Sequence, residues 1–68
     1  MTAETLRNIV IDTLKVINDE HSFNSKTRIN IVDKLEKNKD IYPLFITMAK
    51  YECQGHESLL DYAYRLIK

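Results

Sequence analysis

Residues 41–54, IYPLFITMAKYECQ, carry the pattern that sets the architecture of this chain. Their apolar side chains recur at helical spacing in two adjacent rows. The first row is Ile41, Leu44, Phe45 and Met48 with Glu52 at its end, and the second is Ile46, Ala49 and Cys53 with Tyr51 as a flank. Together the rows cover roughly 220° of the helix circumference, against a little over 100° for an ordinary surface helix. The stretch therefore predicts a helix that is apolar on more than one side.

Local signals bound this helix at both ends. Asp40 is a good N-cap, because its carboxylate can accept hydrogen bonds from unpaired amides of the first turn. Pro43 falls in that turn, where its missing N–H removes no hydrogen bond. The helix is expected to end at about Gln54, and Gly55 is the predicted residue after the C-cap.

The C-terminal run predicts a further helix over about residues 57–67. Ser58 and Asp61 resemble a capping box at its start. Its apolar residues are Leu59, Leu60, Tyr62, Ala63, Tyr64, Leu66 and Ile67. They cover about 200° of the helix, so this helix shares the apolar excess of residues 41–54.

Two more helices are predicted before residue 41. Thr2 can cap a helix over about residues 3–20, and its apolar stripe consists of Leu6, Ile9, Val10, Leu14 and Ile17, widened by Ile11 and Val16. A second helix is expected over about residues 26–38, with Asn24 or Ser25 as its N-cap. Phe23 is expected to pack back on its first turn. This helix is the least apolar of the four.

The sequence therefore predicts an all-α protein, a compact bundle of four short helices over about 3–20, 26–38, 41–54 and 57–67. Its 68 residues form a single helical domain, 1–68. Glycine and proline occur once each, which disfavours a turn-rich β protein. A chain this small has a marginal core, and one cysteine excludes an intramolecular disulfide. Helix packing and oligomerisation remain as sources of stability, and we expect a homodimer.

Two explanations fit the wide apolar arcs. One helix could be central and surrounded by the other three, or the extra surface could be an interface with a second copy or another protein. We favour the interface, partly because four tyrosines are many for this length and tyrosine is enriched at interfaces. The residues expected there are Phe45, Ile46, Tyr51, Leu60, Tyr62 and Tyr64.

Residues capable of catalysis or metal binding are few. Cys53 and His56 are spaced C-x-x-H, and His21 with Glu52 or Glu57 could complete a set. Zinc sites usually need two such pairs, and a catalytic thiol needs an oriented base and a cleft. We therefore expect no enzymatic activity, no metal and no cofactor.

The formal net charge is zero, whereas dedicated nucleic-acid binders are normally basic. The one basic segment suggests an alternative, a nucleic-acid-associated factor that contacts phosphates through the second helix. Its contact residues would be Lys26, Arg28, Lys34 and Lys37. A solvated helix face explains such a mixed run equally well, so nucleic acid is not the expected partner.

The favoured hypothesis is a small regulatory or inhibitory protein that acts by binding an unidentified protein. Its partners would be that protein and a second copy of itself. The absence of a membrane-length apolar run or a signal-peptide pattern, with a lone thiol, favours the cytoplasm and no membrane association. Abundant Ile, Lys and Asn suggest a phage or bacterial source.

Overall fold

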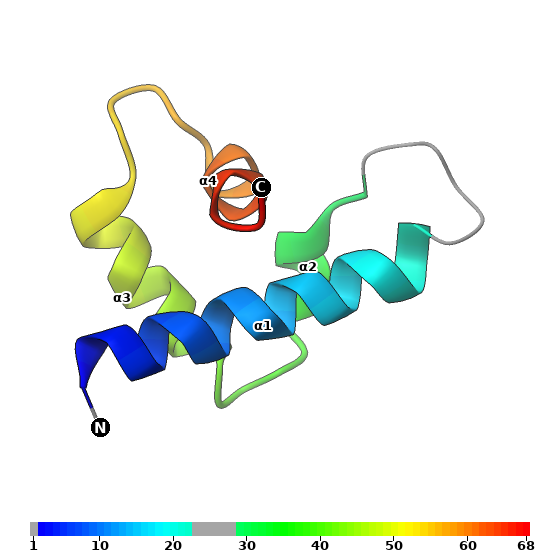
Figure 1. The fold of residues 1–68 in the computed structure, drawn as a ribbon. Helices are drawn as coiled ribbons and strands as arrows, with labels where there is room; N and C mark the ends of the chain where they lie inside the picture. The colour runs from blue at the N-terminus through cyan, green and yellow to red at the C-terminus, as the bar shows by residue number, and fades with distance from the viewer. Residues whose placement is uncertain (1, 23–28) are drawn as a thin grey trace.

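The computed structural model describes residues 2–22 and 29–68, and this part of the chain contains four helices and no strand. The predicted all-α fold is thereby confirmed. The helices are α1 (Ala3–Ser22), α2 (Ile31–Leu35), α3 (Tyr42–Glu52) and α4 (Leu59–Leu66). Figure 1 shows α1 as a long base, with α2, α3 and α4 arranged along one side of it. None of the helices within the described ranges combines the length and hydrophobicity that a membrane crossing requires.

Helix α1 begins where the sequence predicts. The Thr2 hydroxyl oxygen accepts a hydrogen bond from the Thr5 amide at 3.1 Å, so Thr2 satisfies one of the free donors of the first turn. Val10 and Leu14 are fully buried, which places the predicted apolar stripe against the rest of the molecule. Val16, on the edge of that stripe, is 54% exposed.

The predicted second helix over 26–38 is wrong in its extent, because α2 has only five residues, Ile31–Leu35. Asn30 lies outside the helix and caps it, since its side-chain oxygen accepts from the Asp33 amide at 3.0 Å. The side-chain oxygen of Asn38 then accepts hydrogen bonds from the backbone amides of Asp40 and Ile41, each at 3.1 Å. These bonds stabilise the turn that leads into α3. Asparagine side chains compete with helical hydrogen bonding in this way. The predicted caps at Asn24 or Ser25, and the packing of Phe23, lie outside the described residues.

Two predictions about the ends of α3 are corrected. Asp40 does not cap the helix; Ile41 is the N-cap residue and makes no side-chain capping bond, because Asn38 already binds the nearby amides. Pro43 lies in the first turn, as predicted. Gly55 does not adopt the left-handed conformation expected of it, because the chain leaves α3 in an extended conformation at Cys53.

Helix α4 begins at the predicted serine. The Ser58 hydroxyl oxygen accepts from the Asp61 amide at 3.1 Å, which is one half of the proposed capping box. The other half would be a bond from the Ser58 amide to the Asp61 side chain. Ser58 therefore determines where α4 starts.

The core lies where α1, α2, α3 and α4 face one another. Its buried residues are Val10, Leu14, Ile31, Val32, Leu35, Phe45, Ala49, Tyr62 and Ala63. The Phe45 and Tyr62 rings are in contact, with centroids 5.6 Å apart, and join α3 to α4. Only Phe45 and Ala49 of α3 are buried, so α3 is not a central helix surrounded by the other three.

Two aromatic residues of α3 test this core. Phe45→Ala should lower the free energy of unfolding by about 3–5 kcal/mol, because it leaves a cavity in the centre of a small core. Tyr51→Ala should change it by less than about 0.5 kcal/mol, because that ring is 86% exposed. Urea unfolding followed by circular dichroism measures both values, and similar losses for the two variants would contradict this core.

Candidate functional site

The six predicted interface residues lie at different depths. Phe45 and Tyr62 are fully buried, so they belong to the core and offer no surface to a partner in this conformation. Ile46, Leu60 and Tyr64 are half-buried, and each packs against the core. Tyr51 is the exception, with 86% of its surface exposed. An interface formed by these residues stays a prediction, and Tyr51 is the residue most available for it.

Tyr64 also has a role within the chain. Its hydroxyl donates to the backbone carbonyl of Ile29 at 2.6 Å, over a separation of 35 residues. The bond attaches the segment before α2 to the middle of α4. The sequence pattern predicted Tyr64 as an interface residue and gave no sign of this acceptor.

A polar network at Glu52 connects three helices. The Tyr62 hydroxyl donates to Glu52 Oε1 at 3.0 Å, and the Arg7 guanidinium forms an ion pair with the same oxygen. The hydrogen bond from Arg7 is the main reason why the pKa of Glu52 is lowered, and the bond from Tyr62 adds to it. Burial, followed by the bond to Glu52, raises the pKa of Tyr62 to about 12. The network thus holds a carboxylate and a neutral phenol between α1, α3 and α4.

The connection between α3 and α4 is closed by Arg65. Its guanidinium binds both carboxylate oxygens of Glu57, at 2.8 and 2.9 Å, and also donates to the Glu52 carbonyl at 2.9 Å. The same group lies over the Tyr62 ring, 5.2 Å from its centroid. The hydrogen bonds from Arg65 are the main reason why the pKa of Glu57 is lowered to about 2. These contacts of Arg65 fix the loop between α3 and α4.

Cys53 and His56, the C-x-x-H pair, lie in the connection between α3 and α4. The Cys53 thiol donates to the Glu57 carbonyl at 3.1 Å, and His56 is exposed. Within residues 2–22 and 29–68, no group of three or more His, Cys, Asp or Glu side chains is arranged to hold a metal ion.

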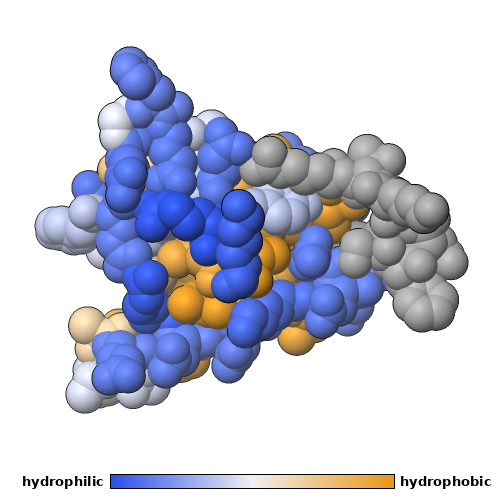
Figure 2. Space-filling model, turned by 45° about the horizontal axis from the view of Figure 1, so that its top comes forward, coloured by the Kyte–Doolittle hydropathy of each residue, from blue (hydrophilic) through white to orange (hydrophobic). Residues whose placement is uncertain are grey.

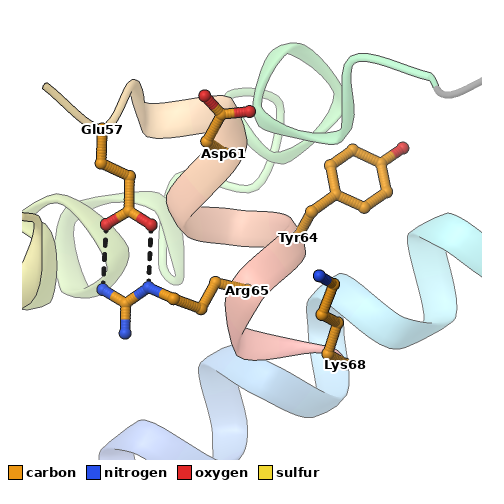
Figure 3. Close-up of a pocket in the computed structure, with 5 residues that line it drawn as sticks. All are labelled: Glu57, Asp61, Tyr64, Arg65 and Lys68. Atoms are coloured by element: carbon orange, nitrogen blue, oxygen red, sulfur yellow. Dashed lines mark hydrogen bonds and ion pairs between the residues drawn. The ribbon is translucent and has the colours of Figure 1, made fainter.

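A shallow pocket of about 490 Å³ lies along α4 and is lined by Glu57, Asp61, Tyr64, Arg65 and Lys68. Figure 3 shows Arg65 extended toward Glu57, with Tyr64 and Lys68 on the other side of the helix. Arg65 and Glu57 bind each other, so these two of the charged side chains that line the pocket are engaged within the chain.

A second groove, of about 580 Å³, lies between α1 and the end of α2 together with the segment that follows it. Thr13, Val16 and Ile17 form its α1 side. The residues on the other side are Lys34, Lys37, Asn38, Lys39 and Asp40. The groove thus brings together two of the four basic residues of the nucleic-acid alternative, Lys34 and Lys37, with Lys39. Lys26 and Arg28 lie outside the described residues.

Comparison of the chain with protein-family models finds no match, and comparisons with curated proteins and with solved structures find none either. We therefore base the functional proposal on the surfaces of the chain itself.

The Glu57–Arg65 pair predicts an acid-sensitive component of stability. The pKa of Glu57 is about 2 in the folded chain against an ordinary value of 4.5, so the pair stabilises the fold above pH 4.5. That contribution should be lost as the pH falls from 4.5 toward 2. Glu57→Gln should lower the free energy of unfolding at neutral pH and flatten its slope across this window. The free energy of unfolding measured by urea titration at several pH values tests this.

The exposed Asp33 supplies the control, because it forms no ion pair within the described residues. Asp33→Asn should retain the wild-type slope over the same range. Parallel loss of stability in wild type and Glu57→Gln would contradict the assignment.

The Tyr64 hydroxyl predicts a second stability effect. Tyr64→Phe should lower the free energy of unfolding by about 1 kcal/mol, because the Ile29 carbonyl loses its donor. Tyr42→Phe is the matched control, since that hydroxyl makes only a long 3.5 Å bond to exposed Glu36, and its effect should stay below about 0.5 kcal/mol. Thermal and urea unfolding measure both, and equal effects would remove the special role of Tyr64.

Proposed function

We propose that this protein is a small regulatory or inhibitory protein that acts by binding another protein, and that it is homodimeric. The observation that carries the proposal is the exposure of Tyr51 on α3, at 86%. Tyr51 is the last residue but one of α3, and an aromatic ring exposed there gains little from contact with water. It can bury on the order of 150–250 Å² against a partner while its hydroxyl stays hydrated.

Tyr51 does not stand alone on its helix. Leu44, Met48 and Tyr51 are spaced i, i+4 and i+7, so they follow one another along the same side of α3. Leu44 and Met48 are half-buried, and Lys50 and Thr47 beside them are exposed. An apolar row with this spacing and a polar border is what a partner groove recognises in helix-in-groove binding.

Apolar surface also reaches the outside elsewhere. Figure 2 shows it in a hollow in the middle of one face, framed by hydrophilic side chains. Val16 and Leu59 are exposed at 54% and 39%. Exposed apolar patches are unfavourable in water, and a chain of 68 residues has a small total surface. Patches of this kind commonly mark interfaces.

A protein partner is favoured over nucleic acid by the distribution of charge. The groove beside α2 has three lysines and one aspartate in its lining, a net charge of 3 − 1 = +2. The formal net charge of the chain is zero, so the charges outside that groove sum to 0 − 2 = −2 and add no net attraction for phosphate. Within α3, the only basic residue is Lys50, which lies beside the row of Leu44, Met48 and Tyr51.

Site-specific cross-linking tests this proposal. A photoreactive phenylalanine analogue at position 51 should form an adduct with a partner protein in cells of the native host, and the same analogue at position 50 should form much less. Position 50 is the matched control because it is exposed on the same helix but points about 100° away.

The captured partner then allows a quantitative test. Tyr51→Ala should weaken its binding at least about tenfold, as expected for the loss of an aromatic anchor. Lys50→Ala should leave the affinity within about twofold, because an exposed residue beside the anchor contributes little. Titration calorimetry measures both. Wild-type affinity in Tyr51→Ala, or equal adducts at positions 50 and 51, would refute binding through this row.

A further inference from the structure

Val16 is the most exposed large aliphatic side chain of the described part of the chain, at 54%. It lies on α1 at the edge of the groove described above, next to Thr13 and Ile17. On a helix, residues three and four positions apart lie next to one another on the surface. The residues at these spacings from Val16 therefore form the surface of α1 around it.

One side of Val16 is basic. Across the groove from it are Lys34, Lys37 and Lys39, with Asp40 as the one acidic residue of the lining. Lys37 and Lys39 are exposed and Lys34 is half-buried.

The side of Val16 away from the groove carries two carboxylates, Asp12 and Asp19, which lie at −4 and +3 from it and are therefore its neighbours on α1. Lys15 lies further round the helix on that side, whereas Glu20, at +4, lies on the groove side of Val16. All four charged residues are exposed. Within residues 2–22 and 29–68, neither these carboxylates nor the three lysines form an ion pair.

From this arrangement we propose that a second copy of this chain docks on the groove, so that two α1 helices meet across a two-fold axis near Val16. In a two-fold dimer the same patch meets itself, so it must be complementary to its own surface. A patch with an apolar centre, carboxylates on one side and lysines on the other meets that condition. The carboxylates of one copy face the lysines of its partner, and Val16 of each copy lies near the axis.

The same charges disfavour a phosphate backbone at this place. A nucleic acid lying in the groove would bring its phosphates close to Asp40 of the lining and to Glu20 on the groove side of α1, as well as to the lysines. A second copy offers each lysine a carboxylate and buries Val16. Helix α1 has 20 residues and is therefore about 30 Å long, which gives the contact a continuous straight edge.

This inference rests on the proposed function only for the statement that the chain is homodimeric. A charge-exchange experiment tests it. Variant one carries Lys34→Glu and Lys37→Glu, so that its patch is acidic on both sides. Variant two carries Asp12→Lys and Asp19→Lys, so that its patch is basic on both sides. Each changes only residues that take part in no ion pair within the described part of the chain.

Sedimentation equilibrium should find wild type dimeric at micromolar concentration, and each variant alone at least tenfold weaker in self-association. An equimolar mixture of the two variants should restore the dimer as a heterodimer, which added salt should weaken. Lys50→Glu, a charge reversal on α3 outside the groove, should dimerise like wild type. Circular dichroism and urea unfolding confirm that every variant is folded.

Three results would overturn the inference: a wild type that stays monomeric, single variants that dimerise like wild type, or a mixture that forms no heterodimer. A fluorescent oligonucleotide bound by wild type but not by variant one, with dimerisation unchanged in that variant, would assign the lysines to nucleic acid instead. Cross-linking at Tyr51 reports on the partner protein separately, so either claim can fail without the other.

Discussion

The fold depends on the way Tyr62 joins an apolar core to a polar network. Its ring packs on Phe45 in the centre of the molecule, while its hydroxyl donates to Glu52. The Arg7 guanidinium binds the same carboxylate from α1. A single side chain thus ties α4 to α3 by contact of rings, and to α1 through a shared charge. A chain this small has a small core, and apolar burial alone stabilises it only marginally. The hydrogen bond from the Tyr62 hydroxyl adds to the stability that its buried ring provides.

Much of this architecture could be predicted from periodicity and capping. The sequence pattern located α1, α3 and α4 to within a few residues, because each has an apolar stripe and a recognisable start at Thr2, Pro43 or Ser58. It failed at α2, where the Asn30 and Asn38 side chains bind backbone amides and restrict the helix to little more than one turn. Propensity and periodicity do not show which asparagine side chains will make such bonds.

The surface features were harder to predict. Helical projection gives the direction of a side chain but not its depth, so Phe45, Tyr62 and Tyr51 looked equivalent, although the first two are buried and the third is exposed. The network at Glu52 had one sequence signal, an acidic residue at the end of the inward row that begins with Ile41. Its partners Arg7 and Tyr62 are 45 and 10 residues away, and no local pattern connects them.

The several contacts of Arg65 limit how this chain can diverge in sequence. Its planar group binds two oxygens of Glu57, one backbone carbonyl and the face of an aromatic ring at once. Lysine preserves the charge, but its ammonium group is not planar and cannot bind both oxygens of a carboxylate in the same way as a guanidinium. It can therefore reproduce only some of the contacts of Arg65. Across diverging lineages position 65 should therefore exchange with lysine far less than the solvated cations of the chain do. If Arg65 changes, positions 57 and 62 should change with it.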